Sequence, residues 1–417
     1  MSTQHVIVIG AGIVGVSTAL RARRHGLDVT LIDRLPPGDA TSFGNAGVLA
    51  SLSVIPVTVP GLLGKVPKML TDPIGPLYLR WQYFPKIIPW LLDYLSNCKP
   101  ERTRYIAEHL AGVTGNSLEE HQALAKGTPA EKRIRTMEYA FAYRSRAGFD
   151  ADAFAWNIRR ELGFDFDVHE GDEVREVEPA LGPNYNCLVV SRAHHGTIDE
   201  PGNYVKDLAA TFADEGGRIL TADVREIVVR DQKFSGVRLE SDEVVEGDHL
   251  ALAGGVWSTR LLEPLGVKIP LEAERGYHVE LHGCNVEPRH AVSITDGKFV
   301  ATPMRGRLRL AGLVELAGID APAIKAPIKT LIAHAKNAFP DLQWESQTDW
   351  MGRRPSTPDS LPVIGPVPNI KGLHLAFGHQ HIGLTGGPRT GRLVADSIAG
   401  QTPNVDLSPY SVERFKR

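Results

Sequence analysis

The sequence has few cysteines, no long apolar run and no excess of positive charge. Its three cysteines, Cys98, Cys187 and Cys284, are far apart, so they indicate neither a disulfide framework nor a CxxC metal-ligand pair. No run of about twenty apolar residues is present, and the N-terminus lacks a signal-peptide pattern, so we expect no bilayer-spanning segment. The net charge of −3 disfavours a nucleic-acid partner, because phosphate contacts need a basic excess. These features predict a cytoplasmic protein.

The richest apolar stretch, PIGPLYLRWQYFPKIIPWLLDYL (73–95), is interrupted by prolines and charges. One interpretation is a pair of helices buried under a second domain. The other is an interfacial segment that rests on a membrane, where the rings of Trp and Tyr are favourable. In that case the protein would lie peripherally on the inner face of the cytoplasmic membrane.

A glycine-rich turn near the N-terminus carries the strongest motif. HVIVI predicts a buried strand, GAGIVG follows it directly, and a helical stretch leads to a second strand, DVTLID. In this GxGxxG pattern Gly10 permits the tight turn, Gly12 allows a pyrophosphate to approach the backbone, and Gly15 allows close helix–strand packing. Asp33 ends the second strand, where it can accept hydrogen bonds from a ribose hydroxyl. The combination predicts a dinucleotide site.

The rest of the chain favours FAD over NAD. A nicotinamide dehydrogenase usually repeats its βαβ units directly, whereas here TSFGNAGV follows the second strand, LALAGG comes much later, and the chain ends in another glycine turn and helix. We therefore predict an α/β fold, in which a Rossmann-like FAD-binding domain of the glutathione-reductase type is interleaved with an α+β substrate domain containing an antiparallel sheet. The predicted FAD domain comprises residues 1–60, 197–256 and 350–417, and the substrate domain comprises 61–196 and 257–349.

Several motifs together resemble the D-amino-acid oxidase and glycine oxidase superfamily, and most closely its bacterial D-amino-acid dehydrogenases. They are VIVIGAGIVGVSTAL, TSFGNAGVL, GTIDEPGNYVKDL, LALAGGVWS, ERGYHVEL and GRRPSTPDSLPVIGPVP followed by AFGHQHIGLTGGP. The likeness covers nearly the whole chain and follows the family's order. It implies FAD as cofactor, bound non-covalently, because related covalent flavoproteins have a cysteine where this chain has Pro355.

The resemblance also implies which residues hold FAD. The turn amides would contact the pyrophosphate, Asp33 and Arg34 the adenosine, and the amides after the second histidine of GHQHIGLTGG the pyrimidine end of the flavin. The implied cofactor-binding residues are Gly10, Gly12, Ile13, Val14, Gly15, Asp33, Arg34, Ser42, Asn45, Ala46, Gly47, Val224, Ala253, Gly254, Trp257, Gly378, Ile382, Gly383, Leu384 and Thr385.

Four residues are candidates for the substrate site. Arg354 matches the family's carboxylate-binding arginine, although the adjacent Arg353 leaves open which side chain points inward. Tyr277 matches a tyrosine over the active site, with a packed strand tyrosine as the alternative. His379 and His381 face the substrate side of the last turn, and His381 stands where glycine oxidases have a second arginine. Two imidazoles are too few for a metal site, so we predict none.

The implied reaction is oxidation of a D-amino acid by hydride transfer to the flavin, with a quinone or another acceptor as partner. The glycine-rich GLTGGP loop suits a cyclic substrate such as D-proline or hydroxy-D-proline. One alternative is an oxidase that passes electrons to oxygen. A second is a flavin-binding subunit without substrate chemistry of its own.

Overall fold

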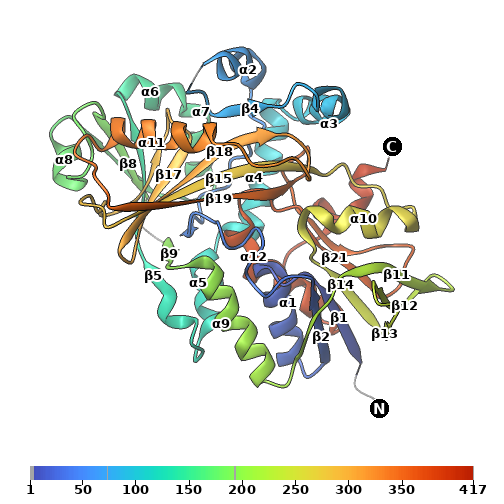
Figure 1. Cartoon of the computed structure of the whole chain (residues 1–417). Coiled ribbons are helices and arrows are strands. Elements are labelled where there is room, and N and C mark those ends of the chain that lie inside the picture. Colours follow the sequence, from blue (N-terminus) through green and yellow to red (C-terminus); the bar gives the residue numbers. More distant parts are fainter. Residues whose placement is uncertain (1–3, 73, 192–193, 417) are drawn as a thin grey trace.

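The computed structural model describes residues 4–72, 74–191 and 194–416, with the side chain of Lys65 left aside. Two large sheets dominate this part of the chain and lie one above the other (Figure 1). The lower sheet has six strands in the order β10 (Arg218–Thr221), β2 (Asp28–Asp33), β1 (His5–Ile9), β14 (His249–Leu252), β21 (Leu373–Phe377) and β20 (Val363–Pro366). Its neighbouring strands run parallel, except that β20 is antiparallel to β21.

Strand β1 shows why this sheet is covered on both faces. Val6 and Val8 pack into a core with the helices on one side, whereas Ile7 and Ile9 pack into a second core on the other side. This alternation is the period of two expected of a strand. The helices of the first core are α1 (Ile13–Arg24), α4 (Pro100–Thr114), α5 (Ser117–Ala125), α9 (Pro201–Asp214) and α12 (Gly383–Ile398). The second core contains β11 (Val224–Arg230), β12 (Lys233–Leu239), β13 (Val244–Glu246) and α10 (Ser258–Leu262).

The upper sheet has nine strands in the described part of the chain. Its order is β19 (Ser346–Ser356), β15 (Glu272–His282), β18 (Arg307–Leu316), β17 (Phe299–Met304), β16 (Ala291–Ile294), β6 (Tyr139–Tyr143), β8 (Cys187–Ser191) and β7 (Phe166–Glu170), and β4 (Leu77–Leu79) pairs with β18. The prediction of an antiparallel sheet holds for most pairs, but β16 runs parallel to β6 and β18 parallel to β4. The sheet is therefore mixed, because long connections rather than hairpins join these strands.

Helices cover the outer face of the upper sheet. Helix α11 (Ala326–Ala338) packs its buried side chains against β15 and β18, as Figure 1 shows above the long strands. The remaining helices of this region are α6 (Arg146–Ala151), α7 (Ala153–Glu161) and α8 (Glu173–Val177). A small sheet, β3 (Val48–Leu49), β9 (Gly196–Ile198) and β5 (Ile134–Thr136), lies between the two large ones. Single turns of 3-10 helix occupy Glu131–Arg133, Gly255–Trp257, Glu263–Leu265, Ser408–Tyr410 and Val412–Phe415.

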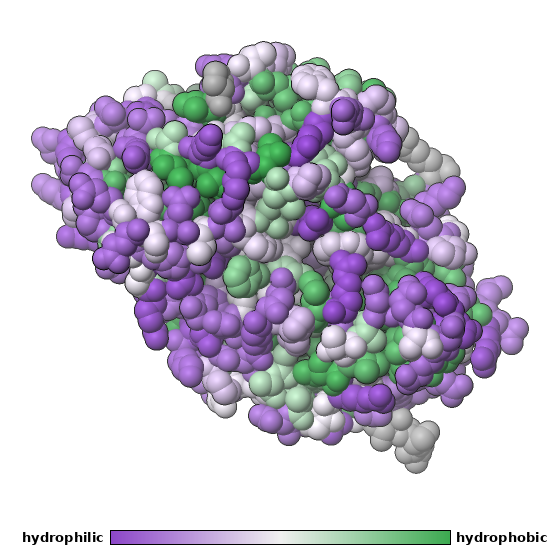
Figure 2. Space-filling view, viewed as in Figure 1, coloured by the Kyte–Doolittle hydropathy of each residue, from purple (hydrophilic) through white to green (hydrophobic). Residues whose placement is uncertain are grey.

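The apolar segment 73–95 is not a buried helix pair, so that interpretation is wrong. Pro73 lies outside the described residues, and the remainder forms β4 and helix α3 (Phe84–Ser96), next to α2 (Leu62–Thr71). Trp90 is buried, but Trp81 is 68% exposed and Leu92 64% exposed. Figure 2 shows apolar residues among polar ones at the top of the molecule, over α2 and α3. In the described residues no helix is long and apolar enough to cross a membrane.

Candidate active site

A cavity of about 1230 Å³ separates the two large sheets, somewhat above the roughly 300–1,000 Å³ of common small-molecule sites. It runs from the N-terminus of α1 past β19 and the last turn to α2 and α3. Its walls include most of the predicted residues: Gly10, Gly12, Ile13, Val14, Asp33, Arg34, Ser42, Asn45, Ala46, Val224, Ala253, Gly254, Trp257, Tyr277, Arg354, His379, His381, Ile382, Gly383, Leu384 and Thr385. Gly15, Gly47 and Gly378 do not line the cavity and instead shape the backbone around it.

The turn between β1 and α1 depends on two glycines. Gly10 has φ 105°, and a Cβ atom there would lie 2.4 Å from the carbonyl oxygen of Ala253. A Cβ atom on Gly15 would lie 1.7 Å from the carbonyl oxygen of Gly10, so this glycine permits the close packing of helix on strand. The first turn of α1 thereby faces the cavity with backbone N–H groups that have no partner within the helix.

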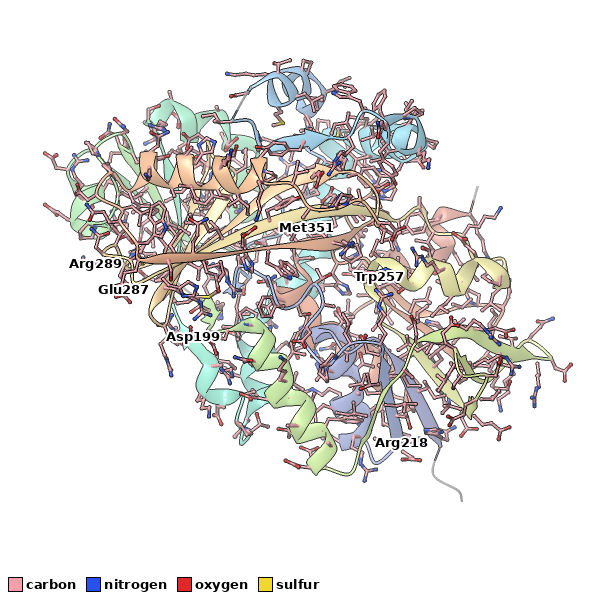
Figure 3. All side chains as sticks on the ribbon, in the orientation of Figure 1. Asp199, Arg218, Trp257, Glu287, Arg289 and Met351 are labelled. Carbon is pink, nitrogen blue, oxygen red and sulfur yellow. The ribbon has the colours of Figure 1, made fainter. Side chains whose placement is uncertain are left out.

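One side chain from the end of β2 and one from a neighbouring loop hold this turn in place. The Asp33 carboxylate accepts a hydrogen bond from the backbone N–H of Ala11 at 2.6 Å, and the Ser42 hydroxyl accepts one from Ile13 at 3.0 Å. The guanidinium of Arg34 lies 4.3 Å from the centre of the Trp257 ring. Figure 3 labels Trp257 beside α10, between the two large sheets. This end of the cavity is therefore bounded by a carboxylate, an arginine and an aromatic ring.

The last helix presents a second set of backbone amides. Helix α12 begins at Gly383, and Gly383, Leu384 and Thr385 line the cavity with its first turn. The hydroxyl of Ser117 donates to the carbonyl of Thr385, and Nε2 of His121 bonds the carbonyl of Leu384 at 2.8 Å. Burial lowers the pKa of His121 to about 4, so a neutral ring makes this contact. The positive end of the α12 dipole can then stabilise negative charge in the cavity.

Arg354 faces the cavity, and Arg353 does not. Residues alternate along β19, so Met351, labelled in Figure 3, and Arg353 lie on the opposite face. Nε of Arg353 donates to the carbonyl of Ile319 at 2.6 Å, outside the cavity. This answers the question that the Arg-Arg pair left open, because only Arg354 lines the cavity.

A bulge in β18 and a glycine in β15 position Arg354. Leu313 has φ 57° where the register with β15 shifts, and its carbonyl accepts a hydrogen bond from Nη1 of Arg354 at 2.9 Å. The carbonyl of Gly312 accepts another from Nη2 at 3.3 Å. A Cβ atom on Gly276 would lie 2.3 Å from Cζ of Arg354. Two of the five N–H groups of Arg354 are therefore fixed, and three remain for a ligand.

An acidic residue lies beside this arginine. Glu274 pairs with Arg354 in the register of β15 and β19, and both side chains line the cavity. Burial raises the pKa of the Glu274 carboxyl, and the charge of Arg354 opposes that shift. The pKa of Arg354 is itself lowered by burial, while Glu274 raises it. The site therefore contains one cation, Arg354, beside a carboxyl group, Glu274, whose pKa is raised.

The hydroxyl of Tyr277 is already engaged. It donates to Oε2 of Glu315 at 2.5 Å and accepts from the backbone N–H of Ile324 at 3.2 Å. The ring packs in the core beneath α11, and burial with the Glu315 contact raises the pKa of Tyr277 to about 12. Tyr277 also lines the cavity, but its hydrogen-bonding group is used within the sheet. Contact between this hydroxyl and a substrate stays a prediction.

The two histidines of GHQH differ in their surroundings. His379 is buried and its Nε2 contacts the hydroxyl of Thr390 at 2.9 Å. His381 is exposed on the cavity wall near Arg354. Desolvation lowers the pKa of each imidazole to about 4, and the charge of Arg354 adds to the effect at His381. Both rings are neutral at pH 7. Among the described residues no group of three or more His, Cys, Asp or Glu is placed to hold a metal ion.

Sequence reasoning missed several residues of the cavity wall. They are Gly44, Arg159, Glu274, Trp350 and Gln380. Glu274 and Trp350 could have been found from the alternation of their strands, two residues from Gly276 and Gly352 respectively. Arg159 carries no such signal, because its place depends on how α7 packs against the upper sheet.

Comparison with known proteins gives the family. Residues 5–397 match the family described as FAD dependent oxidoreductase. A D-amino-acid oxidase of Bradyrhizobium diazoefficiens is 38% identical, with 99% of each chain covered, and a D-amino acid dehydrogenase of the same organism is 31% identical, with 98% of each covered. The crystal structure of glycine oxidase from Geobacillus kaustophilus has the same fold, with a TM-score of 0.74 at 20% identity over the whole of both chains. The chain therefore belongs to the FAD-dependent oxidoreductases of the D-amino-acid oxidase type, and FAD is its cofactor.

Proposed function

We propose that the protein oxidises a D-amino acid to the imino acid, with FAD bound non-covalently between the two sheets. The observation that carries the proposal is the position of Arg354. Its three available N–H groups face the same cavity as the α1 turn and the first turn of α12. The names of the D-amino-acid oxidase and dehydrogenase relatives support the substrate class. The division of the chain into an FAD domain and a substrate domain belongs to the same proposal. Helices α4 and α5 pack into the core of the six-stranded sheet and β19 belongs to the nine-stranded sheet, so these elements lie on the other side of the predicted boundaries.

The residues present fit FAD at two places. The amides at the start of α1, with Ser42 and Asp33 behind them, would hold the pyrophosphate and ribose, and the amides of Gly383 to Thr385 would hold the pyrimidine end. When bound, FAD accepts a hydride from the substrate and passes the electrons to a second acceptor. Pro355 provides no side-chain atom for a covalent link, so these contacts alone would retain the cofactor.

The protein's own residues would bind the amino acid in a fixed orientation and would allow its amine to be neutral. Arg354 would bind the carboxylate through paired N–H donors, which fixes the direction of the Cα–H bond. The substrate amine must be neutral when its Cα–H is removed. The neutral rings of His379 and His381 leave Arg354 as the main charge near it, and the raised pKa of Glu274 weakens its hold on an ammonium group. No separate general base is needed.

The second acceptor would be a quinone that enters between α2 and α3. Apolar side chains of both helices line that end of the cavity, and the side chains of Leu63 and Leu92 are each 64% exposed there. Exposed Lys68 and Lys86 on these helices would meet anionic lipid headgroups. The protein would then work peripherally on the inner face of the cytoplasmic membrane, in a reducing compartment that keeps Cys98, Cys187 and Cys284 as free thiols.

A second candidate is an oxidase that passes electrons to oxygen, and the 38% identical relative named as an oxidase favours it. The two share the first half-reaction and differ only in the second. Reoxidation of the substrate-treated enzyme by air, compared with reoxidation by a soluble quinone, separates them. Fast reoxidation in air with release of hydrogen peroxide would favour the oxidase.

The test of the proposal is anaerobic flavin bleaching with a panel of D-, L- and N-methyl amino acids, including D-proline and hydroxy-D-proline for the cyclic class that the GLTGGP loop favours. We expect D-amino acids to reduce the flavin and their L-enantiomers to leave it oxidised. Loss of the flavin absorbance with L-enantiomers alone would overturn the stereochemistry. If no amino acid reduces the flavin, the proposed activity is wrong and a flavin-binding subunit without substrate chemistry remains.

A further inference from the structure

Part of the cavity wall carries several polar side chains contributed by elements other than the strand of Arg354. Two strands and one helix each present one face to the cavity here, and the residues on each face are spaced as that type of element requires. The face of β6 presents Tyr139, Phe141 and Tyr143, the face of β16 and the residues after it presents Ser293 and Thr295, and α7 with its N-cap presents Asp152, Ala155 and Arg159. Spacings of two on a strand and of three and four on a helix place each set on a single face. These eight residues define the β6–α7 recess.

Arg159 is the cation of this recess. Its guanidinium lies over the ring of Trp156 at 4.4 Å and over Phe141 at 5.4 Å, and Nε donates to the carbonyl of Leu52 at 3.3 Å. Burial lowers its pKa to about 10, so the side chain is charged at pH 7. That charge is oriented by two aromatic rings and one carbonyl, which leaves the two terminal nitrogens for a ligand.

The carboxylate whose charge acts on Arg159 is hydrogen-bonded to another side chain. Asp152 contributes to the potential at Arg159, but the described part of the chain contains no ion pair of Arg159 with it or with another carboxylate. Asp152 accepts a hydrogen bond from the hydroxyl of Tyr143 at 3.2 Å, and that hydroxyl accepts one from Nε1 of Trp156 at 2.9 Å. Among the described residues no carboxylate occupies the terminal nitrogens of Arg159, so they can pair with an anion that enters the cavity.

A row of residues across the upper sheet connects the positions of the two cavity arginines. Phe141, Ser293, Val300 and Ala311 are neighbours in one row across β6, β16, β17 and β18, and all four line the cavity. Arg159 lies over the first, and Arg354 binds the carbonyl of Gly312, next to the last. Three strand spacings separate the ends of this row, about 14 Å. An acidic amino acid with two or three methylene groups can place a carboxylate toward each arginine over such a span.

We propose that Arg159 binds the side-chain carboxylate of the substrate, so that the enzyme prefers acidic D-amino acids of the size of D-glutamate. This inference rests on the proposed function and adds the substrate's side chain to it. Arg354 would hold the α-carboxylate over one end of the row, and Arg159 the distal carboxylate over the other. Glycine oxidases have a second arginine where this chain has the neutral His381. Here the second cation would be Arg159 of α7, and it would contact the side chain of the substrate. A neutral or cyclic substrate would leave Arg159 without a partner.

The variant Arg159→Met tests the assignment, with Arg160→Met as its matched control. Arg160 is the next residue of α7, and its guanidinium lies over Phe166, 4.8 Å from the ring centre and outside the cavity. In the wild type we expect kcat/KM for D-glutamate to exceed that for D-glutamine by about tenfold or more. Arg159→Met should lower the value for D-glutamate by about 30- to 100-fold and that for D-alanine by less than about threefold. Arg160→Met should change neither. Equal losses for both substrates, or a wild-type preference for D-glutamine or D-lysine, would overturn the proposal.

A binding measurement separates this inference from the proposed activity. Glutarate has two carboxylates but no amine, and butyrate has only one carboxylate, so both can be titrated into the FAD-loaded enzyme and followed by the flavin spectrum. We expect glutarate to bind about tenfold or more tightly than butyrate, and Arg159→Met to remove the difference. If that holds while no amino acid reduces the flavin, the activity is wrong and the Arg159 site stands. If D-alanine reduces the flavin but glutarate binds no better than butyrate, the activity stands and the Arg159 site is wrong.

Discussion

The two walls of the cavity present different kinds of group. The wall above the six-stranded sheet offers backbone N–H groups at the start of α1 and α12. The wall made by the nine-stranded sheet offers side chains, chiefly Arg354, Glu274 and Trp350. Backbone amides suit a cofactor that is the same in every member of the family, because their positions depend on the fold and on glycines. Side chains can change without changing the strands that carry them, so they suit the choice of substrate.

The largest effect should come from the backbone wall. In Gly10→Ala the added Cβ meets the carbonyl of Ala253 at 2.4 Å, at a φ of 105° that alanine rarely adopts. Strain and overpacking together should cost on the order of 3 kcal/mol or more and displace the turn. We expect purified protein with little FAD, measured from the ratio of flavin to protein absorbance.

Gly26→Ala is the matched control for that change. Gly26 also has positive φ, 81°, but no atom lies within 4 Å of a Cβ placed there. The substitution should lower the free energy of unfolding by about 1 kcal/mol and leave FAD bound. If both variants retain FAD equally, the close approach at Gly10 does not matter for the cofactor.

On the side-chain wall, Arg354→Met should give the next largest effect. Loss of a buried guanidinium that binds the α-carboxylate should lower kcat/KM for the best D-amino acid by about 100- to 1,000-fold. The FAD content should be unchanged, because Arg354 belongs to the opposite wall. Steady-state kinetics and the flavin spectrum measure the two properties separately.

Arg353→Met gives the comparison for Arg354. Its guanidinium contacts the carbonyl of Ile319 and the ring of Trp257, and Arg353 itself does not line the cavity, so we expect a change in kcat/KM below about tenfold. A larger loss in Arg353→Met than in Arg354→Met would assign the carboxylate to the wrong arginine.

The difference between the walls also explains what the sequence could predict. The spacing of Gly10, Gly12 and Gly15 predicts a site made of backbone amides, because the geometry of the turn itself requires a glycine at each of these positions. Arg354 needed the family motif, and the sequence could not separate it from Arg353 until the register of β15 and β19 fixed which side chain faces inward. Arg159 could not be found, because it is brought to the cavity by the packing of α7 on a strand whose partner β16 follows about 150 residues later. The sequence could therefore predict the parts of the site that depend on local backbone geometry. It could not predict which side chains the packing of distant segments brings into the cavity.

Two buried histidines, one in or beside each large sheet, should respond differently to pH. His374, on β21 of the six-stranded sheet, has a pKa lowered to about 4 by burial. The unfolded chain binds a proton more readily between about pH 6.5 and 4, so stability should fall as the pH drops through that range. The contribution at neutral pH is on the order of 1–3 kcal/mol, and His374→Phe should make the free energy of unfolding less dependent on pH there.

His290, beside the nine-stranded sheet, should show the opposite sign. Burial lowers its pKa, but Glu178 and Glu138 outweigh this and raise it above the usual value. Its contribution is fully present below about pH 6.5 and is lost as the pH rises through the folded-state pKa. His290→Gln should therefore destabilise the protein more at pH 6 than at pH 9, as measured by denaturant unfolding. The same sign of pH dependence in both variants would contradict this difference between the two histidines.

The smallest effect should come from the part of the cavity beside α2 and α3, where the lining residues of these two helices are apolar or aromatic. The double variant Leu63→Ser with Leu92→Ser replaces two side chains that are each 64% exposed beside the opening. If a quinone enters there, its KM should rise about tenfold, because roughly 1–2 kcal/mol of apolar contact is lost, while anaerobic reduction by a D-amino acid keeps its rate. Ile219→Ser with Val244→Ser changes two exposed apolar residues away from the cavity and should alter neither half-reaction. An unchanged KM for the quinone in the first variant would mean that the acceptor reaches FAD by another route, and that the exposed apolar surface of α2 and α3 serves a purpose separate from electron transfer.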